Sequence, residues 1–285
     1  KQLVKIYTKT PMDVRKVRSQ YEMHYEADVP YEDRIRIDYH IKKNISVDGD
    51  DVTNISPPLH GDKVNLKIAY IDIETDDSQG MVSPHDANLS ILCLTYVDTF
   101  DEKYHIFYIE NGYALDRDKI STLIESETGV KYDFVLHSFS SEREMLTDFN
   151  DFLISSDPDI VTGWNVEYDT GFLSTRTKGG ISFSDYVVMD LMGGYARLHE
   201  GVLDSKALNY VASSELGRGK MKRPAVWILW HHSMEELLAY NFVDVELCKR
   251  IDEKIGVIDF HYSLALEAGC SIEATEFSTK IIDMF

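Results

Sequence analysis

Cysteine is scarce in this sequence. Only three cysteines occur among 285 residues, at Cys93, Cys248 and Cys270. Their number is odd and their spacing matches no metal-binding motif, which argues against a disulfide framework and against a cysteine-rich zinc site. Reduced, mostly buried thiols in a cytosolic protein are therefore expected.

Long apolar runs are also absent. No stretch approaches the roughly 20 apolar residues that a membrane helix needs, so no membrane partner is expected. The N-terminus at Lys1 lacks both an initiator methionine and the apolar core of a signal peptide. Either the methionine was removed or the chain is a piece of a longer protein. The 44% hydrophobic content is typical of a soluble globular protein.

Basic residues are few relative to acidic ones. The chain has 29 Lys and Arg against 49 Asp and Glu, which gives a formal net charge of -20. Such a balance argues against a broad non-specific nucleic-acid binder, which is usually basic. It leaves open an enzyme whose acids hold metal ions, and it also leaves open a protein from a saline habitat.

The first 62 residues have the pattern of a small α+β piece. Alternating apolar residues predict strands at 3–8 and 34–41. Thr10-Pro11 is a typical helix start and predicts a helix over 10–25. Residues 47–62 are rich in Asp, Asn, Ser, Pro and Gly, and they predict a loop or linker.

The rest of the chain predicts an α/β domain with a mixed sheet. An early group of strands is followed by alternating strands and helices, which is the pattern of such domains. Strands are expected at 67–73, 89–97, 104–109, 134–137, 159–162 and 186–191, with a hairpin joining the second and third. Helices are expected at 141–154, 165–173, 207–216 and 234–255, followed by an apolar helical stretch to residue 285.

Two acids interrupt an otherwise apolar run, Ile68-Ala69-Tyr70-Ile71-Asp72-Ile73-Glu74-Thr75. Asp72 and Glu74 are two positions apart, so a strand places both side chains on one face. Neighbouring carboxylates on a buried strand repel each other and are costly to desolvate. Divalent cations offset that cost, so the pair predicts a metal site whose other ligands lie elsewhere in the chain.

Two further acids are placed to complete such a site. Asp169 follows a predicted strand-to-helix turn, where ligand sites of α/β sheets commonly lie. Tyr240 and Asp244 are four positions apart on a predicted helix and so share a face. Four carboxylates suit a two-metal phosphoryl-transfer site, because Mg²⁺ takes oxygen ligands. A nearby phenol can orient the attacking water.

The order of these residues resembles the three exonuclease motifs of family B DNA polymerases. The three matching segments are Tyr70-Ile71-Asp72-Ile73-Glu74-Thr75, Asp159-Ile160-Val161-Thr162-Gly163-Trp164-Asn165 leading to Asp169, and Tyr240-Asn241-Phe242-Val243-Asp244. Two residues separate Asn165 from Tyr168, where many family members have three. The resemblance covers residues 65–285. The polymerase signatures Tyr-x-Asp-Thr-Asp and Asp-x-x-Ser-Leu-Tyr-Pro-Ser do not occur.

The resemblance implies a division of the chain into three parts. Residues 63–255 would form an RNase H-like exonuclease fold, an α/β arrangement with a mixed β-sheet flanked by helices. Residues 1–62 would be part of the polymerase N-terminal domain. Residues 256–285 would be a helical segment that leads toward the polymerase palm.

The resemblance also implies an activity, which is metal-dependent 3′→5′ proofreading hydrolysis at the 3′ end of single-stranded or frayed DNA. Two Mg²⁺ ions, replaceable by Mn²⁺, would be held by the four acids Asp72, Glu74, Asp169 and Asp244, with Tyr240 positioning the water. Substrate contacts would come from Thr75, Trp164, Asn165 and Tyr168. The expected partners are the palm, fingers and thumb of the same polymerase and a sliding clamp. The expected location is the cytoplasm, at the nucleoid if the source is prokaryotic.

Two other functions remain open at this stage. The first is a non-catalytic scaffold or DNA-guiding module, which clustered unpaired carboxylates disfavour. The second is a stand-alone exoribonuclease of the same superfamily, which the N-terminal segment disfavours. Metal titration discriminates against the first, and comparison of RNA with DNA substrates discriminates against the second.

Several other residues have simpler interpretations. The basic cluster is expected either to touch a phosphate backbone or to form a solvated loop, and consists of Arg218, Lys220, Lys222 and Arg223. Trp227 and Trp230 are expected in the core. Asp190 is expected to end its strand, and Asp76 and Asp77 to be loop acids. The pair His231-His232 is expected at the surface or in packing, because adjacent residues diverge.

Overall fold

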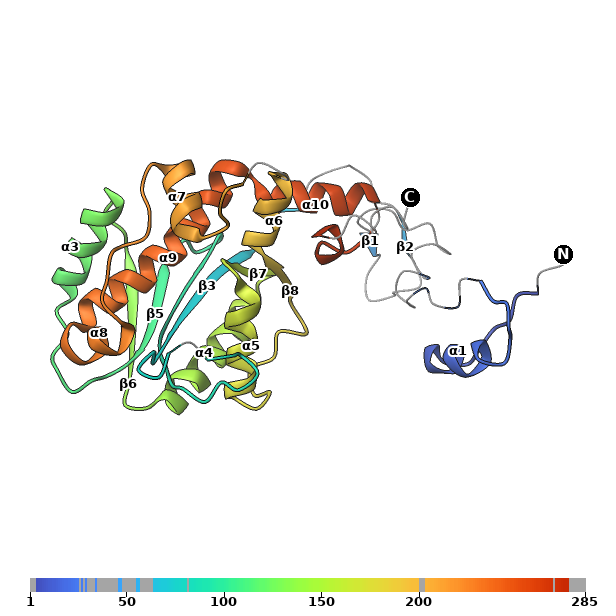
Figure 1. Cartoon of the computed structure of the whole chain (residues 1–285), viewed down its shortest axis with the longest axis horizontal. Coiled ribbons are helices and arrows are strands. Elements are labelled where there is room, and N and C mark those ends of the chain that lie inside the picture. Colours follow the sequence, from blue (N-terminus) through green and yellow to red (C-terminus); the bar gives the residue numbers. More distant parts are fainter. Residues whose placement is uncertain are drawn as a thin grey trace. The chain divides into compact units, whose positions relative to one another are not determined.

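The computed structural model describes residues 4–25, 27, 29, 34, 46–47, 55–56, 64–80, 82–199, 203–268 and 270–276. These residues belong to two compact units. One unit comprises Val64–Tyr262, and the other is drawn from the residues on either side. Figure 1 shows the order of the helices and strands along the chain.

The described residues of the N-terminal part include helix α1 and a short ladder. Helix α1 spans Pro11–Arg18, with Thr10 as its extended N-cap residue and proline at its start. The predicted end at residue 25 was wrong, because α1 buries none of its residues and so has no packed face to extend it. The strand predicted at 3–8 was also wrong for residues 4–8, which are mostly exposed and have no strand partner in the described part.

The short ladder lies in a segment that was predicted as loop. Strand β1, Ser46–Val47, pairs antiparallel with β2, Ile55–Ser56. The register pairs Ser46 with Ser56 and Val47 with Ile55, and Val and Ile are residue types that favour strands over loops. The strand predicted at 34–41 lies outside the described residues except for Arg34.

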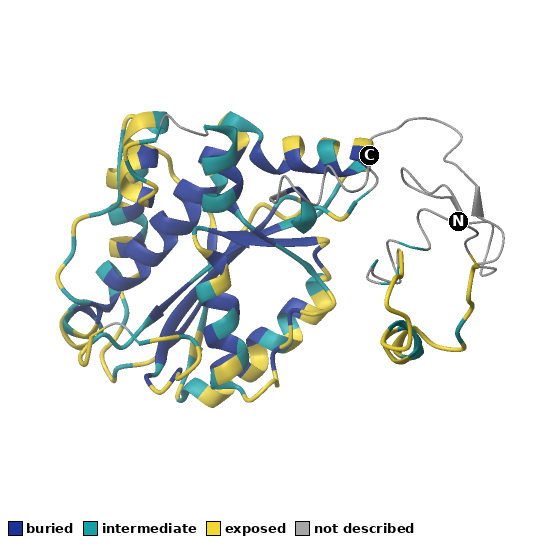
Figure 2. Cartoon of the chain, turned by 45° about the vertical axis from the view of Figure 1, so that its right-hand side comes forward, coloured by how far each residue is buried: buried dark blue, intermediate teal, exposed yellow. Residues whose placement is uncertain are grey.

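A six-stranded mixed sheet organises the larger unit. Strands β3 and β5 both pair antiparallel with β4, while the remaining neighbours in the sheet are parallel. The strand order is β6 (Phe134–Phe139), β5 (Tyr104–Ile109), β4 (Ile91–Asp98), β3 (Ile68–Thr75), β7 (Ile160–Gly163) and β8 (Val187–Asp190). The predicted hairpin is present. This sheet, with helices on both faces, confirms the predicted α/β class and is consistent with an exonuclease domain of the RNase H-like type (Figure 2).

Central strand β3 divides its side chains between two layers. Ala69, Ile71 and Ile73 enter the main apolar core. Residues of α4 (Glu142–Ser156) and α5 (Val166–Arg176) fill the same core. The alternate side chains face α9 (Met234–Ile255), since Tyr70 donates to Asp252 of that helix at 2.6 Å. Because side chains alternate along a strand, one face of β3 packs in the apolar core and the other face carries the acids.

The helix over 234–255 was predicted with the bounds that α9 has, and it is the most buried helix of the unit. Three neighbouring helices pack against α9: α3 (Arg117–Thr128), α7 (Leu208–Leu216) and α8 (Val226–His232). Sequence reasoning missed α3 and α8, and also α6 (Leu191–Leu198). Beyond α9 the chain continues through α10 (Val257–Ala268) to the 3-10 turn η1 (Glu273–Glu276). Among the helices that the structure describes, none has the length and apolar character to cross a membrane.

Candidate active site

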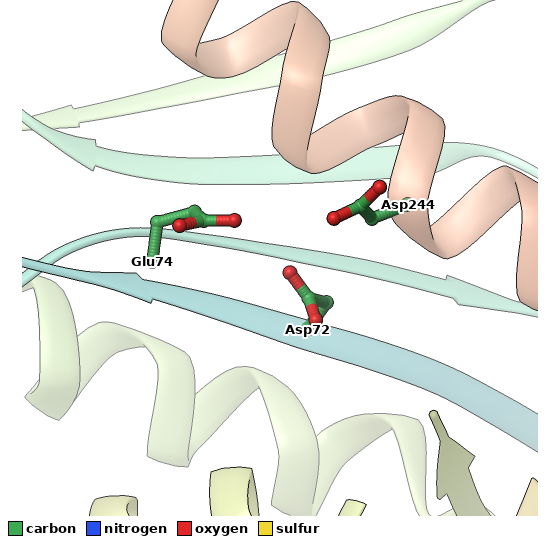
Figure 3. A group of neighbouring side chains, drawn as sticks. All are labelled: Asp72, Glu74 and Asp244. Atoms are coloured by element: carbon green, nitrogen blue, oxygen red, sulfur yellow. The ribbon is translucent and has the colours of Figure 1, made fainter. Parts of the chain in front are cut away.

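Three carboxylates meet between the sheet and α9. Asp72 and Glu74 extend from the same face of β3, and Asp244 extends toward them from α9 (Figure 3). One oxygen from each can be chosen so that all three lie within 4.8 Å of one another. Strand alternation and one helix position thus produce the cluster that the acidic pair predicted.

Burial makes this cluster electrostatically unfavourable. Glu74 and Asp244 are buried, and Asp72 is partly buried beside them. Burial and the nearby Asp244 charge raise the pKa of Asp72 to about 8. Burial, followed by the Asp72 charge, also raises the pKa of Glu74 well above its usual range. Concentrated negative charge of this kind favours either protons or bound cations.

The donor set fits a hard divalent cation. All three groups offer carboxylate oxygens, which are the ligands that Mg²⁺ and Mn²⁺ accept. Asp244 Oδ1 is buried and has no hydrogen-bond partner among the described residues. Buried polar atoms in proteins are nearly always satisfied, so an orphaned carboxylate oxygen in this position is consistent with a metal ligand.

Asn241 orients the first acid. Its side-chain nitrogen donates to Asp72 Oδ2 at 2.7 Å and to the Asp72 carbonyl at 3.2 Å. Asn241 lies one turn before Asp244 on α9, so both side chains reach the cluster. Asn241 belongs to the third motif, but the sequence alone assigns it no role. The i, i+3 spacing to Asp244 was the available signal.

Asp169 lies beside the cluster but outside the three-carboxylate set. Its Oδ1 accepts a hydrogen bond from the Ile73 amide at 3.2 Å. The pairing of β3 with β7 ends at Tyr70 and Thr162, so beyond that point a side chain of α5 can reach the strand. Burial, and then the charge of Asp72, raise the pKa of Asp169 well above its usual range. Asp169 therefore belongs to the same electrostatic unit.

A tight turn sets the position of α5. A Cβ on Gly163 would lie 2.5 Å from the Ile71 carbonyl oxygen, so only glycine fits there without a shift. Asn165 adopts the left-handed conformation with φ 63°. Its backbone nitrogen donates to Asp190 Oδ1 at 2.7 Å. Asp190 ends β8, as predicted, and its side chain also caps α6.

The predicted substrate residues are spread around the cluster. Thr75 ends β3 at a register shift, and the exposed Asn165 begins α5. The hydroxyl of Tyr168 donates to the Val82 carbonyl at 2.9 Å and so ties down the loop after β3. Trp164 instead donates to the Lys206 carbonyl at 2.9 Å. The Trp164 ring lies beside Tyr195, with ring centroids 6.1 Å apart.

The basic cluster enters the acid site. Lys220 Nζ lies 2.6 Å from Asp244 Oδ2, and Arg223 Nη2 lies 3.8 Å from Glu74 Oε2. Both cations also lie over the Tyr240 ring, at 5.0 Å for Lys220 and 4.3 Å for the Arg223 guanidinium carbon. Arg218 pairs with the buried Glu246 of α9. Only Lys222 is exposed, so a purely solvated loop was the wrong alternative.

Asp77 connects this basic segment to α8. It accepts hydrogen bonds from the backbone nitrogens of Val226 and Trp227, at 3.0 and 2.9 Å, and lies 3.9 Å from Arg223. Trp227 is 38% exposed, so its predicted place in the core was wrong. Helix α8 packs inward through Val226 and Leu229, which leaves Trp227 on its outer side.

Fold and site together define an α/β domain with a buried acidic centre suited to metal binding. A family model described as "DNA polymerase family B, exonuclease domain" matches residues 22–204. Because the match covers more than half of the chain, the protein belongs to this family. The matched range contains Asp72, Glu74 and Asp169, while Tyr240 and Asp244 lie after it.

Two phage DNA-directed DNA polymerases are similar to this chain. The enzyme of Escherichia phage RB69 is 23% identical, over 78% of this chain and 29% of its own length. The enzyme of Enterobacteria phage T4 is 25% identical, over 73% of this chain and 28% of its own length. The chain thus spans less than a third of these relatives.

Proposed function

We propose that this chain is a metal-dependent 3′→5′ exonuclease that removes nucleotides from single-stranded or frayed DNA ends. The observation that carries the proposal is the convergence of Asp72, Glu74 and Asp244 within 4.8 Å in a domain of this family. Lys220 and Arg223 pair with Asp244 and Glu74, yet gathering three carboxylates in a buried place still has no structural advantage, because each additional charge is costly to desolvate. A catalytic role explains why the cluster is present.

The four acids would bind two divalent ions. Asp72, Glu74 and Asp244 would hold one divalent ion, and Asp72 would also face a second that Asp169 holds or orients through water. Mg²⁺ is the proposed ion, and Mn²⁺ would substitute for it. Bound ions would activate a water molecule and stabilise the leaving oxygen of the phosphodiester. Asn241 would keep the Asp72 carboxylate in its orientation.

Tyr240 would position the attacking water through its hydroxyl. Burial, and then the charge of Asp244, raise its pKa, so the phenol stays protonated at neutral pH. A protonated phenol can both donate and accept a hydrogen bond without acting as a strong base. The cations above the ring hold its plane in place.

The 3′-terminal nucleotide would be held by residues at the ends of β3 and β7. Thr75, Asn165 and Tyr168 are the proposed contacts. Trp164 is proposed to contact DNA that extends as far as its ring. Mispaired ends unpair at a lower energetic cost than paired ends, so they would enter the site more often. That difference would give proofreading its selectivity.

The remaining proposals concern the whole polymerase. The chain would act with the palm, fingers and thumb of a family B enzyme, and with a sliding clamp through those parts. The similarity to two phage polymerases supports this placement. Cytoplasmic action at the nucleoid is proposed for a prokaryotic host.

The test uses 5′-labelled single-stranded DNA with Mg²⁺. The chain should release mononucleotides stepwise from the 3′ end, and Asp72→Ala with Glu74→Ala should abolish release. Persistence at the parent rate would contradict the assignment. RNA of the same sequence, assayed in parallel, separates a deoxyribonuclease from an exoribonuclease, and absence of Mg²⁺ and Mn²⁺ binding would favour a scaffold.

A further inference from the structure

A second concave site lies next to the acid cluster. It has a volume of about 340 Å³ and opens beyond the C-terminal end of β3. Its lining includes Asp76 and Ser78 from the loop after β3, Leu92 from β4, and Trp227, Trp230 and His231 from α8. None of these residues is assigned a role in the proposed hydrolysis.

The aromatic wall of this hollow is fixed in place. Trp230 Nε1 donates to the Ile109 carbonyl at 3.3 Å, and the Trp227 backbone is held by Asp77. The rings of Trp230 and His231 meet edge to face with centroids 4.7 Å apart. Trp227 is nevertheless 38% exposed, which places a large flat apolar surface in contact with solvent. The Trp227 ring also meets the His231 ring edge to face, with centroids 6.3 Å apart, so its indole can accept a stacked base at a reduced ordering cost.

The hollow lies close to the acid cluster along the chain. Asp76 follows Glu74 by two residues, a separation of at most about 7 Å along the chain. Arg223 lies within 4 Å of both Glu74 and Asp77. Asp77 in turn holds the backbone of Trp227, so these contacts link the acid cluster to the aromatic wall of the hollow. A strand whose terminal phosphodiester lies on the acids would therefore carry a neighbouring group to the hollow.

The lining chemistry selects the kind of group. The Asp76 carboxylate disfavours a phosphate, whereas the charge of Glu142 is paired with Arg176. Ser78, Ser90 and Asp76 offer acceptors to a ring that carries amino groups. Stacking on tryptophan is the usual way in which proteins hold an unpaired base. We propose that the hollow binds a nucleobase of the DNA strand whose 3′ end lies at the acids, an inference that rests on the proposed function.

The test is a scan of binding with single-stranded oligonucleotides that each lack one base near the 3′ end. Binding by the complete chain is measured in Ca²⁺ instead of Mg²⁺, so that affinity is read separately from hydrolysis. Trp227→Ala should weaken binding of the intact oligonucleotide by about fivefold or more, as expected for loss of one stacked base. Removal of the base that occupies the hollow should weaken binding by the parent protein to a similar extent. The same removal should leave the affinity of Trp227→Ala unchanged.

Two variants serve as controls. Phe100→Ala removes an exposed ring at the opposite end of β3, where Asp98 pairs with Ala69, and should not alter any titration. Trp227→Phe keeps a stacking ring and should retain binding. If Trp227→Ala does not fold, the tryptophan fluorescence of the parent protein provides a second measurement. Intact oligonucleotide should quench this fluorescence, and the oligonucleotide that lacks the base occupying the hollow should not.

Failure of this inference is separable from failure of the proposed function. Parallel assays in Mg²⁺ measure hydrolysis of the intact oligonucleotide. If the parent hydrolyses DNA but Trp227→Ala does not weaken binding, or weakens it equally whichever base is missing, the nucleobase site alone would be overturned. Base-specific binding without hydrolysis would instead support the hollow and refute the exonuclease.

Discussion

Lys220 Nζ lies 2.6 Å from Asp244 Oδ2, and the Asp244 side chain is only 3% exposed. Arg223 approaches Glu74 from the same segment of chain. Two cations of the protein therefore partly neutralise acids that are also the proposed metal ligands. Any divalent ion that binds must share Glu74 and Asp244 with them.

This competition predicts that Arg223→Gln binds divalent ions more tightly. Removing a positive charge near Glu74 lowers the repulsion that an incoming ion meets, and roughly fivefold tighter Mn²⁺ binding is expected. Isothermal titration calorimetry measures the change. Lys222→Gln is the matched control, because Lys222 is exposed and has no ion pair in the described part of the chain. Equal or weaker binding by Arg223→Gln would show that Arg223 supports the ion instead.

The acid cluster predicts an unusual dependence of stability on pH when metal is absent. The folded-state pKa of Asp72 is raised to about 8 from a usual value near 3.8. The folded chain therefore holds a proton that the unfolded chain releases between these values. Stability should fall as pH rises from about 4 to 8, by at most about 1.4 kcal/mol per pH unit for this group.

Urea unfolding in EDTA across that pH range measures the effect. Asp72→Asn should reduce the slope, because the amide does not ionise. Saturating Mg²⁺ should restore stability at the upper end of the range, since the ion replaces the proton. A stability profile in EDTA that rises between pH 4 and 8 would contradict the proposed origin of the shift.

The hydrogen bonds from Asn241 to Asp72 predict a positioning role. Asn241→Ala should lower kcat for DNA hydrolysis by about 10- to 100-fold, as is usual for groups that orient a metal ligand. Divalent-ion affinity should weaken in the same variant, which a residue with a purely structural role would not cause. Circular dichroism checks that the variant is folded. An unchanged kcat with reduced thermal stability would limit Asn241 to packing.

The close approach at Gly163 predicts that even alanine is not tolerated there. The added Cβ would displace the Ile71 carbonyl, which lies next to Asp72 in β3. Gly163→Ala should destabilise the domain by about 1–3 kcal/mol. It should also reduce nuclease activity in the fraction that remains folded. Gly179→Ala is a poor control because its φ is positive, whereas Gly171→Ala meets only ordinary contacts and should change little.

The sequence predicted those elements that carry a strong local pattern. Strand β3 was recognisable from its apolar run, and α9 from its long helical periodicity. Helix α3 was missed because only Ile120 and Ile124 are buried, which leaves a very narrow apolar stripe. Short helices next to proline or glycine, such as α8, give similarly little periodic signal.

The candidate site was predictable only in part. Asp72 and Glu74 could be identified from the sequence because they are two charged residues in an otherwise apolar strand. The contacts of Asn241 with Asp72, and of Arg223 with Glu74, join residues that are far apart in the chain. No local pattern encodes such distances, so the orienting amide and the inward-facing cations required the fold.

Buried like charges in the cluster also set a limit on heat resistance. This chain carries Asp72 and Glu74 where neutral groups of the same shape would pack with less repulsion. The carboxylates that the proposed nuclease activity requires therefore lower the thermal stability of the folded chain. A double change of Asp72→Asn and Glu74→Gln, made merely to protect primers from degradation, should also yield a protein that survives heating longer than its active parent.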